Sequence, residues 1–569
     1  MAQDLRSRPL DDTLSDDSAP HDNDAATTVT RAGRRVARLA NVWWRVPALA
    51  ALALLALPLY ARVNSVSGTF LSHPTTLLWP LLGLSALYAV ACLLIVGARG
   101  PRSRRVALVE LGVLLLAGVV FRAVVFGTPP LISHDAYRYA WDPYLLAHGV
   151  SPYLHTPSDP ALIPLRDGAI WPMLNWRNAP TIYPPGAQSF FFLVYLVKPL
   201  SIWAVKTAIT ASDAIVGALL LALLRRRGLD ARLTLLYWWS PIAVIEFAGN
   251  AHIDAVAVAW VLLALLLAEE RWRGARFAAG VALALATLTK FYPLLFVLAI
   301  GRRRDRSLYV GLAGTIALAY LPFLGGGSRS TGFLATYVGQ RFPDQGILVV
   351  AIARFVGFFG GGDALVVALQ AIAALALCGV ILRWRIRRGP SIEATTLGLT
   401  ALYFALAPHT FPWYVAIVLP LVALLVGRHS RYSAASTSNR LLPHPTRPFP
   451  LRREGELARR RFGSGSPVQS FRMAVNRLGS ALAPTSRRYG KGAGGIGSAP
   501  VLAMWLFALW IPFTYIMFAP GGNAHLFVWL SLATVVDAAL PWLISKRHAV
   551  FAEMHADTGA SDDPQVHSA

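Results

Sequence analysis

The chain has 569 residues, of which 55% are hydrophobic and only 14% are charged. An ordinary soluble chain carries about a quarter charged residues, so this composition excludes an ordinary soluble enzyme. The formal net charge of +24 would suit a nucleic-acid-binding protein. Half of it, however, comes from residues 428–491, with fourteen Lys and Arg and two Glu, and most of the rest lies in short clusters beside apolar runs. That positive-inside pattern predicts a polytopic membrane protein that binds membrane lipids and no nucleic acid.

The N-terminal residues 1–42 are rich in Asp, Ser and Thr and end in a basic stretch. This composition predicts a disordered cytoplasmic tail. The first apolar run, near Trp44, follows too many polar residues to be a cleaved leader, so we expect a retained span. The prediction is a multi-pass protein of the bacterial cytoplasmic (inner) membrane, with both termini in the cytoplasm.

The core, residues 43–427, alternates apolar runs with basic clusters. The predicted fold is all-α, with about 12–14 transmembrane helices and interfacial helices in the first large external loop, 127–186. The expected spans lie near 43–61, 75–97, 105–126, 233–249, 252–268, 307–324, 363–382, 393–407 and 412–427.

Two regions fit this count poorly. The run 276–301 lies between two basic clusters and must cross an even number of times, yet it is too short for two spans. We therefore expect a broken pair with its tip at Lys290–Pro293, where Pro293 favours the break. The run 187–224 must cross an odd number of times; one span plus one interfacial segment is expected, and three crossings remain an alternative.

The C-terminal part divides into three segments. Residues 428–499 are rich in Pro, Gly, Ser and Arg, which predicts a basic, disordered cytoplasmic insertion without a catalytic role. Residues 500–545 predict the last transmembrane helices, and 546–569 a cytoplasmic tail.

The external loop holds the most unusual sequence, rich in Tyr, Trp and Asp. We expect one short helix from Ser133 to Tyr139 and a second that begins at Pro143, with Asp142 as its cap and Gly149 at its end. Asp135 follows the third span directly. It is either a general base for an acceptor hydroxyl or a residue favoured only by the helix dipole.

Other candidates lie on the same predicted side. His252 and Asp254 either cap the next span or form a polar wall, and two such residues are a weak metal signal. Lys290 either snorkels to the interface or neutralises an anion such as a lipid phosphate. The weaker candidates for the same task are Arg341, Arg354 and His409.

The sequence indicates no resident cofactor, although it leaves a divalent cation open. Cys92 and Cys378 each lie inside an apolar run, which excludes a disulfide framework and a cysteine metal site. No Walker loop or nucleotide-type glycine turn is present. Because activated nucleotides are cytoplasmic, an external sugar transferase would need a membrane-borne donor.

The order of these features resembles the multi-spanning glycosyltransferases of the C superfamily that use polyprenyl-phosphate sugars. The closest types are the bacterial integral-membrane mannosyltransferases and the catalytic mannosyltransferase of GPI-anchor assembly. The resemblance covers roughly residues 105–300, and beyond them only hydropathy agrees. The residues that carry it are Asp135, Asp142, Gly149–Tyr153, Tyr183–Pro185, Asn250–Asp254 and Lys290–Pro293.

The resemblance implies an inverting transfer of a sugar, mannose by family analogy, from a polyprenyl-phosphate donor to a lipid- or glycan-borne hydroxyl at the external face. It implies that Asp135 is the catalytic base and that Lys290 stabilises the leaving phosphate. We expect His252, Asp254, Asp142, Tyr183 and Arg341 to bind substrate or lipid phosphate. The sequence departs from the family pattern at Pro143 and in the 428–499 insertion.

Two other functions remain open. A transporter or flippase of a lipid-linked saccharide should show matching broken segments in both halves and ionisable groups near the midplane. The sequence shows one clear break, and its polar residues gather on one side. A non-catalytic membrane scaffold would keep the fold without the chemistry.

Overall fold

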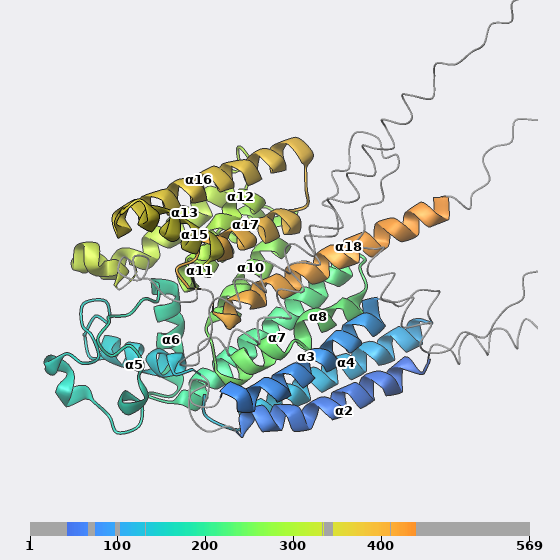
Figure 1. Cartoon of the computed structure of the whole chain (residues 1–569), viewed down its shortest axis with the longest axis horizontal. Coiled ribbons are helices and arrows are strands. Elements are labelled where there is room, and N and C mark those ends of the chain that lie inside the picture. The colour runs from blue at the N-terminus through green and yellow to red at the C-terminus, as the bar shows by residue number, and fades with distance from the viewer. Residues whose placement is uncertain are drawn as a thin grey trace, which may run out of the picture.

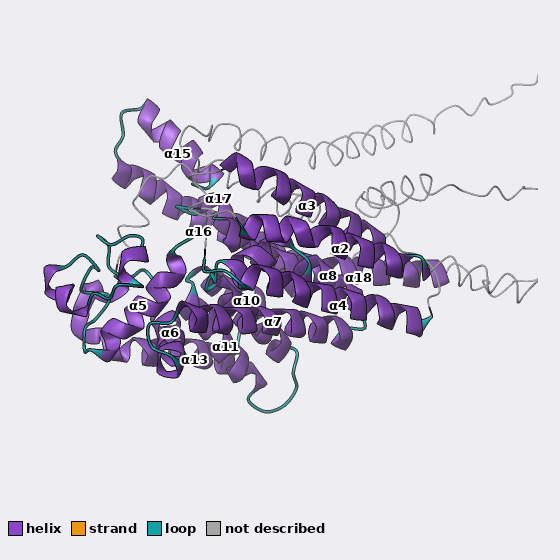
Figure 2. Cartoon of the chain, turned by 90° about the horizontal axis from the view of Figure 1, so that it is seen from below, coloured by secondary structure: helices purple, strands orange, loops and turns teal. Residues whose placement is uncertain are grey.

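The computed structural model describes residues 43–65, 74–96, 103–130, 133–332, 334, 345–409 and 411–439. Throughout this part of the chain the regular elements are helices, and none is a strand (Figure 2), so the predicted all-α membrane fold is confirmed. The predicted segments 1–42, 500–545 and 546–569, and most of the insertion 428–499, lie outside the described residues.

Three long helices open the bundle: α2 (Arg45–Asn64), α3 (Pro74–Val96) and α4 (Arg104–Phe126). All three contain an apolar stretch long enough to cross a membrane, and their bounds agree with the first three predicted spans. Helix α2 packs against both others, for example through Tyr60 and Phe121, whose ring centroids lie 4.9 Å apart.

The following segment forms helix α5 (Asp135–Ala147) and two 3₁₀ turns, η2 (Pro160–Leu165) and η3 (Trp171–Met173). The prediction of two short helices was wrong, because α5 runs through Pro143. Proline removes only one N–H, and the buried face of α5 together with an Arg138–Asp142 ion pair one turn apart outweighs that loss. Gly149 adopts φ +74° and ends the helix as predicted.

Helices α6 (Pro185–Val197) and α7 (Ile202–Arg226) form the apolar run 187–224, for which we expected an odd number of membrane crossings. Only α7 is long enough to span a membrane, whereas α6 is a short apolar helix. The arrangement agrees with one span plus one shorter segment. In Figure 1, α5 and α6 lie at one end of the bundle, opposite the end toward which α18 (Val418–Asn439) extends.

Residues 231–268 do not form the two continuous spans that we expected. The first half is broken into η4 (Ala231–Thr234), α8 (Leu235–Trp238), α9 (Pro241–Ala243) and the π-helix η5 (Val244–Gly249). Pro241 interrupts the helical hydrogen bonding, and the following pair of segments, 241–249 and α10 (Asp254–Ala268), is bent by 119°. The bend places the Asn250–Asp254 turn at the end of the bundle near α5.

The next helices contain the predicted break. Helix α11 (Ala275–Thr289) stops before Lys290, which has extended backbone, and η6 (Tyr292–Phe296) and α12 (Val297–Ile300) follow. Helix α13 (Arg306–Tyr320) then packs closely on α11, because Gly280 lets the backbones approach: a Cβ there would lie 2.1 Å from the Leu308 carbonyl oxygen.

The remaining described helices are η7 (Leu321–Thr331), α15 (Ile347–Phe358), α16 (Asp363–Arg388), α17 (Ile392–Leu406), η8 (Pro412–Ile417) and α18. Helix α18 continues past residue 428, where we expected the insertion to begin. Across the described residues, six helices are long and apolar enough to cross a membrane, the bent pair makes a seventh, and five shorter apolar helices accompany them.

Candidate functional site

Asp135 is the first residue of α5 and is partly open to solvent, with 21% of its side chain exposed. Its backbone N–H donates to the Ser133 hydroxyl at 3.3 Å. One carboxylate oxygen accepts a hydrogen bond from the Asn175 amide at 2.5 Å, and the other lies 3.8 Å from Nδ1 of His252. The carboxylate is thus held in place from one side and remains accessible to an acceptor.

The bend before α10 brings His252 and Asp254 to the same place. Ala251 has φ +57°, a conformation that costs about 1–2 kcal/mol in a residue with a Cβ. This strained turn buries the His252 ring and starts α10 at Asp254, whose negative charge suits the helix N-terminus. The two sequence interpretations of this segment, a helix start and a polar wall, therefore describe the same geometry.

Lys290 lies at the break between α11 and η6, and 16% of its side chain is exposed. Its Nζ lies 3.2 Å from an Asp254 carboxylate oxygen. The same ammonium group lies over two aromatic rings, 4.9 Å from the centroid of Tyr414 and 5.7 Å from that of Tyr183. The break thus presents a partly exposed cation that is paired with the buried carboxylate of Asp254.

Tyr183 forms part of the wall beneath this lysine. Its ring packs edge-on against Tyr139 and Phe191, and its hydroxyl donates to the Tyr139 hydroxyl at 3.4 Å. Burial, reinforced by the negative charge of Asp135, raises the pKa of both phenols well above the usual value. Both hydroxyl groups therefore keep their protons at physiological pH.

Asp142 stands apart from this cluster. The Asp142 carboxylate is fully enclosed; it accepts from Arg138 Nε at 3.1 Å and from Gln188 Nε2 at 3.2 Å. These contacts tie α5 to the start of α6 and favour a supporting role. Arg341 lies outside the described residues.

The sequence did not predict two residues of the site, Glu246 and Trp413. Glu246 lies in the π-helix, with one carboxylate oxygen 3.2 Å from Nε2 of His252. Trp413 comes from far along the chain, and its ring stacks on His252 with centroids 3.7 Å apart. An acidic residue inside an apolar run was a signal for Glu246. Trp413, a single tryptophan near the end of a predicted span, had no comparable signal in the sequence.

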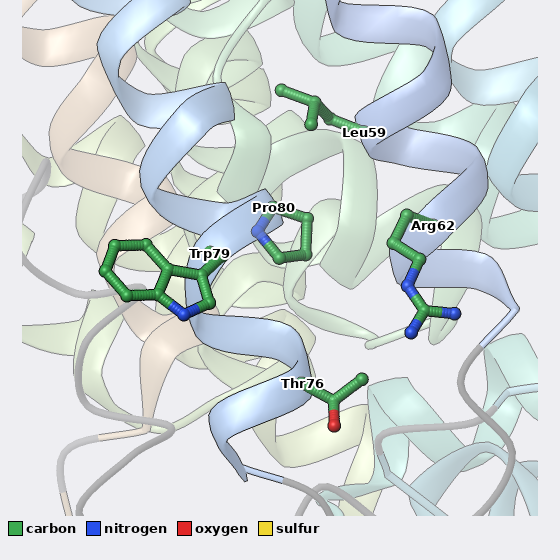
Figure 3. Close-up of a pocket in the computed structure, with 5 residues that line it drawn as sticks. All are labelled: Leu59, Arg62, Thr76, Trp79 and Pro80. Carbon is green, nitrogen blue, oxygen red and sulfur yellow. The ribbon is translucent and has the colours of Figure 1, made fainter.

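The described residues contain no group of three His, Cys, Asp or Glu side chains placed to hold a metal ion. Cys92 is buried in α3, and Cys378 is half-buried in α16. A separate hollow of about 590 Å³ lies between α2 and α3 (Figure 3). Arg62 is the one charged residue that lines this hollow, so it holds no carboxylate that could act as a base.

The cluster combines the solvent-accessible carboxylate of Asp135 with the cation of Lys290, and the Asn250–Asp254 turn contacts both. Asp135 contacts His252, Lys290 contacts Asp254, and only Ile253 separates the two contacted residues along the chain. A base and an anion-stabilising group in one place are what a group transfer from a phosphate leaving group requires.

Among the comparisons with known proteins, one family model matches part of the chain. Residues 67–303 match the family described as "Alpha-(1->6)-mannopyranosyltransferase, N-terminal domain", a range that contains the whole cluster except Trp413 and Tyr414. A comparison with curated proteins found no match. Among solved structures, a loose similarity was found to the crystal structure of ArnT from Cupriavidus metallidurans bound to undecaprenyl phosphate. The sequence identity is 13% and the TM-score 0.37, over 80% of this chain and 81% of that chain. Residues 67–303, less than half of the chain, are therefore similar to the N-terminal domain of the alpha-(1->6)-mannopyranosyltransferases.

Proposed function

We propose that the protein transfers mannose from a polyprenyl-phosphate donor to a hydroxyl group of a lipid or glycan acceptor, with inversion at the anomeric carbon and at the external face of the bacterial inner membrane. The observation that carries this proposal is the position of Asp135, a partly exposed carboxylate held by Asn175 within the matched domain. Mannose is supported by the family description. A membrane-borne donor is supported by the lack of a nucleotide-binding motif in the sequence.

In the proposed reaction, Asp135 takes the proton of the acceptor hydroxyl as its oxygen attacks the anomeric carbon. The bond from that carbon to the phosphate oxygen breaks, and the polyprenyl phosphate leaves with the electron pair. Attack opposite the leaving group inverts the anomeric centre. In this proposal Lys290, partly exposed at the helix break, neutralises the charge that develops on the phosphate.

The test is a membrane assay with a radiolabelled polyprenyl-phosphate mannose. Asp135→Asn removes the base and should lower transfer by about 10²–10⁴-fold. Asp159→Asn is the matched control, because Asp159 lies in the same loop and its carboxylate contacts His155 and the Ala161 N–H, outside the site. Unchanged transfer in Asp135→Asn would exclude this base. Movement of the labelled lipid across the membrane without a new glycosidic bond would favour the flippase.

Orientation can be tested in a variant without the native cysteines. Ala169→Cys places a thiol on the exposed loop near η3, and Arg273→Cys places one in the exposed α10–α11 turn at the other end. The proposal expects an impermeant thiol reagent to label only position 169 in intact cells. Labelling of position 273 instead would reverse the orientation and place both termini outside.

A further inference from the structure

His252 lies between two carboxylates of unequal exposure. Its Nδ1 is 3.8 Å from Asp135 and its Nε2 is 3.2 Å from Glu246. The histidine ring and Glu246 are buried, whereas about a fifth of the Asp135 side chain is exposed. One imidazole therefore connects the proposed base to a carboxyl group that the substrate cannot reach.

The ring of His252 cannot turn away from these two partners. It is the last member of a column of four stacked rings, and successive planes differ by 10–13°. The column consists of His409, Phe411, Trp413 and His252. The backbone fixes the ring as well, since the His252 N–H donates to the Glu246 carbonyl at 2.9 Å. Each ring nitrogen consequently keeps its own carboxylate.

This arrangement limits how protons can be distributed among Asp135, His252 and Glu246. A neutral imidazole carries a proton on one nitrogen, so it donates to one carboxyl group and must accept from the other. A charge is least stable where water is excluded, and this disfavours the ionised form of Glu246 more than that of Asp135. Each carboxyl group also accepts one amide hydrogen bond, and the one from Asn175 to Asp135, at 2.5 Å, is much shorter than the one from Asn250 to Glu246, at 3.3 Å. The two nearby cations are directed elsewhere: Lys290 contacts Asp254, and Lys206 donates to the carbonyl oxygens of residues 128 and 249.

We propose that Glu246 is a proton-carrying positioning residue, which acts on the base through His252. The carboxylic acid of Glu246 donates a hydrogen bond to Nε2. The imidazole proton is then on Nδ1, where it faces Asp135 and keeps that carboxylate ionised and oriented. In the structure neither ring nitrogen completes a hydrogen bond, although Nε2 is within 3.2 Å of Glu246 and Nδ1 within 3.8 Å of Asp135, and catalytic contacts of this kind often tighten when substrate binds. The inference rests on the proposed role of Asp135 as the base.

The first experiment compares two substitutions of Glu246. In Glu246→Gln the amide still donates to Nε2, so kcat should stay within about threefold of wild type. In Glu246→Ala the donor is lost, and kcat should fall by about 10- to 100-fold at unchanged donor KM, as is typical when the outer partner of a functional histidine is removed. Glu110→Gln is the matched control: Glu110 is also buried, but its partner is Arg232. This control should lose stability and keep its pH profile.

The pH profile gives a second readout. At alkaline pH, wild-type Glu246 would lose its proton, Nε2 would become the donor, and the Nδ1 lone pair would face Asp135. Transfer should therefore decline at high pH in wild type and persist in Glu246→Gln. The titratable groups that interact with this trio are His134, Tyr139, Tyr183, Asp254 and Lys290, and Lys206 on α7 lies nearby, where it donates to the carbonyl oxygen of residue 249. All of them remain in Glu246→Gln, so a decline that persists there would overturn the proposal.

A direct measurement covers the case in which Glu246→Gln does not fold. The infrared band of a buried protonated carboxylic acid should be present at neutral pH in wild type and persist in Asp135→Asn. Its loss in Asp135→Asn would place the proton on Asp135 and overturn the inference. Failure of the two proposals is distinguishable: an active Asp135→Asn refutes the base, whereas an inactive Asp135→Asn with an equally inactive, folded Glu246→Gln refutes only the role of Glu246.

Discussion

The contact between Lys290 and Asp254 allows the structural and the catalytic role of the lysine to be separated. We predict that Lys290→Met and Asp254→Asn each destabilise the protein and that the double variant regains stability without regaining transfer. Methionine keeps the length of the lysine stem and asparagine keeps the shape of the aspartate. The series therefore changes charge with little change in packing.

The expected losses in stability can be estimated from the distance and the burial of the two side chains. At the observed separation of 3.2 Å, the attraction between two unit charges is about 5 kcal/mol at an effective dielectric constant of ~20, and desolvation offsets most of it. Removal of one partner exposes the desolvation cost of the other, which is about 3–5 kcal/mol for a buried charge. Lys290→Met leaves the buried Asp254 unpaired and should cost the full amount. Asp254→Asn leaves a lysine that is partly exposed and lies over the Tyr414 ring, so its cost should be about half.

Thermal unfolding in detergent gives the order of stability: the double variant should lie within about 1 kcal/mol of wild type, above both single variants. Transfer from the labelled donor should fall by about 10²–10³-fold in every variant that lacks the lysine, because a charge-stabilising group is lost at the leaving phosphate. If the double variant regains wild-type transfer, Lys290 serves only as the counter-ion of Asp254, and its assignment to the phosphate is refuted.

Three further predictions concern the surroundings of the site. Asp142→Ala should lower the free energy of unfolding by about 3–5 kcal/mol, because Arg138 is left buried and unpaired, while the kcat of the folded fraction stays near wild type. Gly280→Ala should destabilise the α11–α13 contact by about 1–3 kcal/mol in thermal unfolding, whereas Gly314→Ala, where a Cβ meets nothing within 4 Å, should be neutral or stabilising. Trp413→Leu should lower kcat by about tenfold with little change in donor KM, since His252 loses the ring that fixes its plane. An unchanged kcat would show that the stacked column does not position His252.

The parts of the fold that could be predicted from the sequence are those governed by local patterns. Apolar runs and basic clusters located the first three helices, and the short run between two such clusters located the break at Lys290. The same local reasoning failed at Pro143. There the cost of one missing N–H was outweighed by burial of a whole helix face, which is a tertiary effect.

The site was only partly predictable, for a related reason. Asp135, His252, Asp254 and Lys290 lie at helix ends, where a charged residue in an apolar context stands out in the sequence. Glu246 meets His252 only because a π-helix and a positive φ at Ala251 bring the two side chains together, and no regular periodicity anticipates that geometry. The stacked tryptophan lies more than 150 residues away in the chain, so the contact is a property of the fold.

The buried acids of the described residues divide by the kind of partner that they have. Asp213, Glu110 and Glu393 each contact an arginine, which holds its proton at any accessible pH, so these pairs are permanently charged and join helices. The acids of the site instead face His252 or Lys290, side chains that can give up a proton. A Glu→Gln change therefore breaks an ion pair in the scaffold but preserves a hydrogen-bond donor at position 246. This difference is why the same substitution should separate a residue that holds the bundle together from one that positions the base.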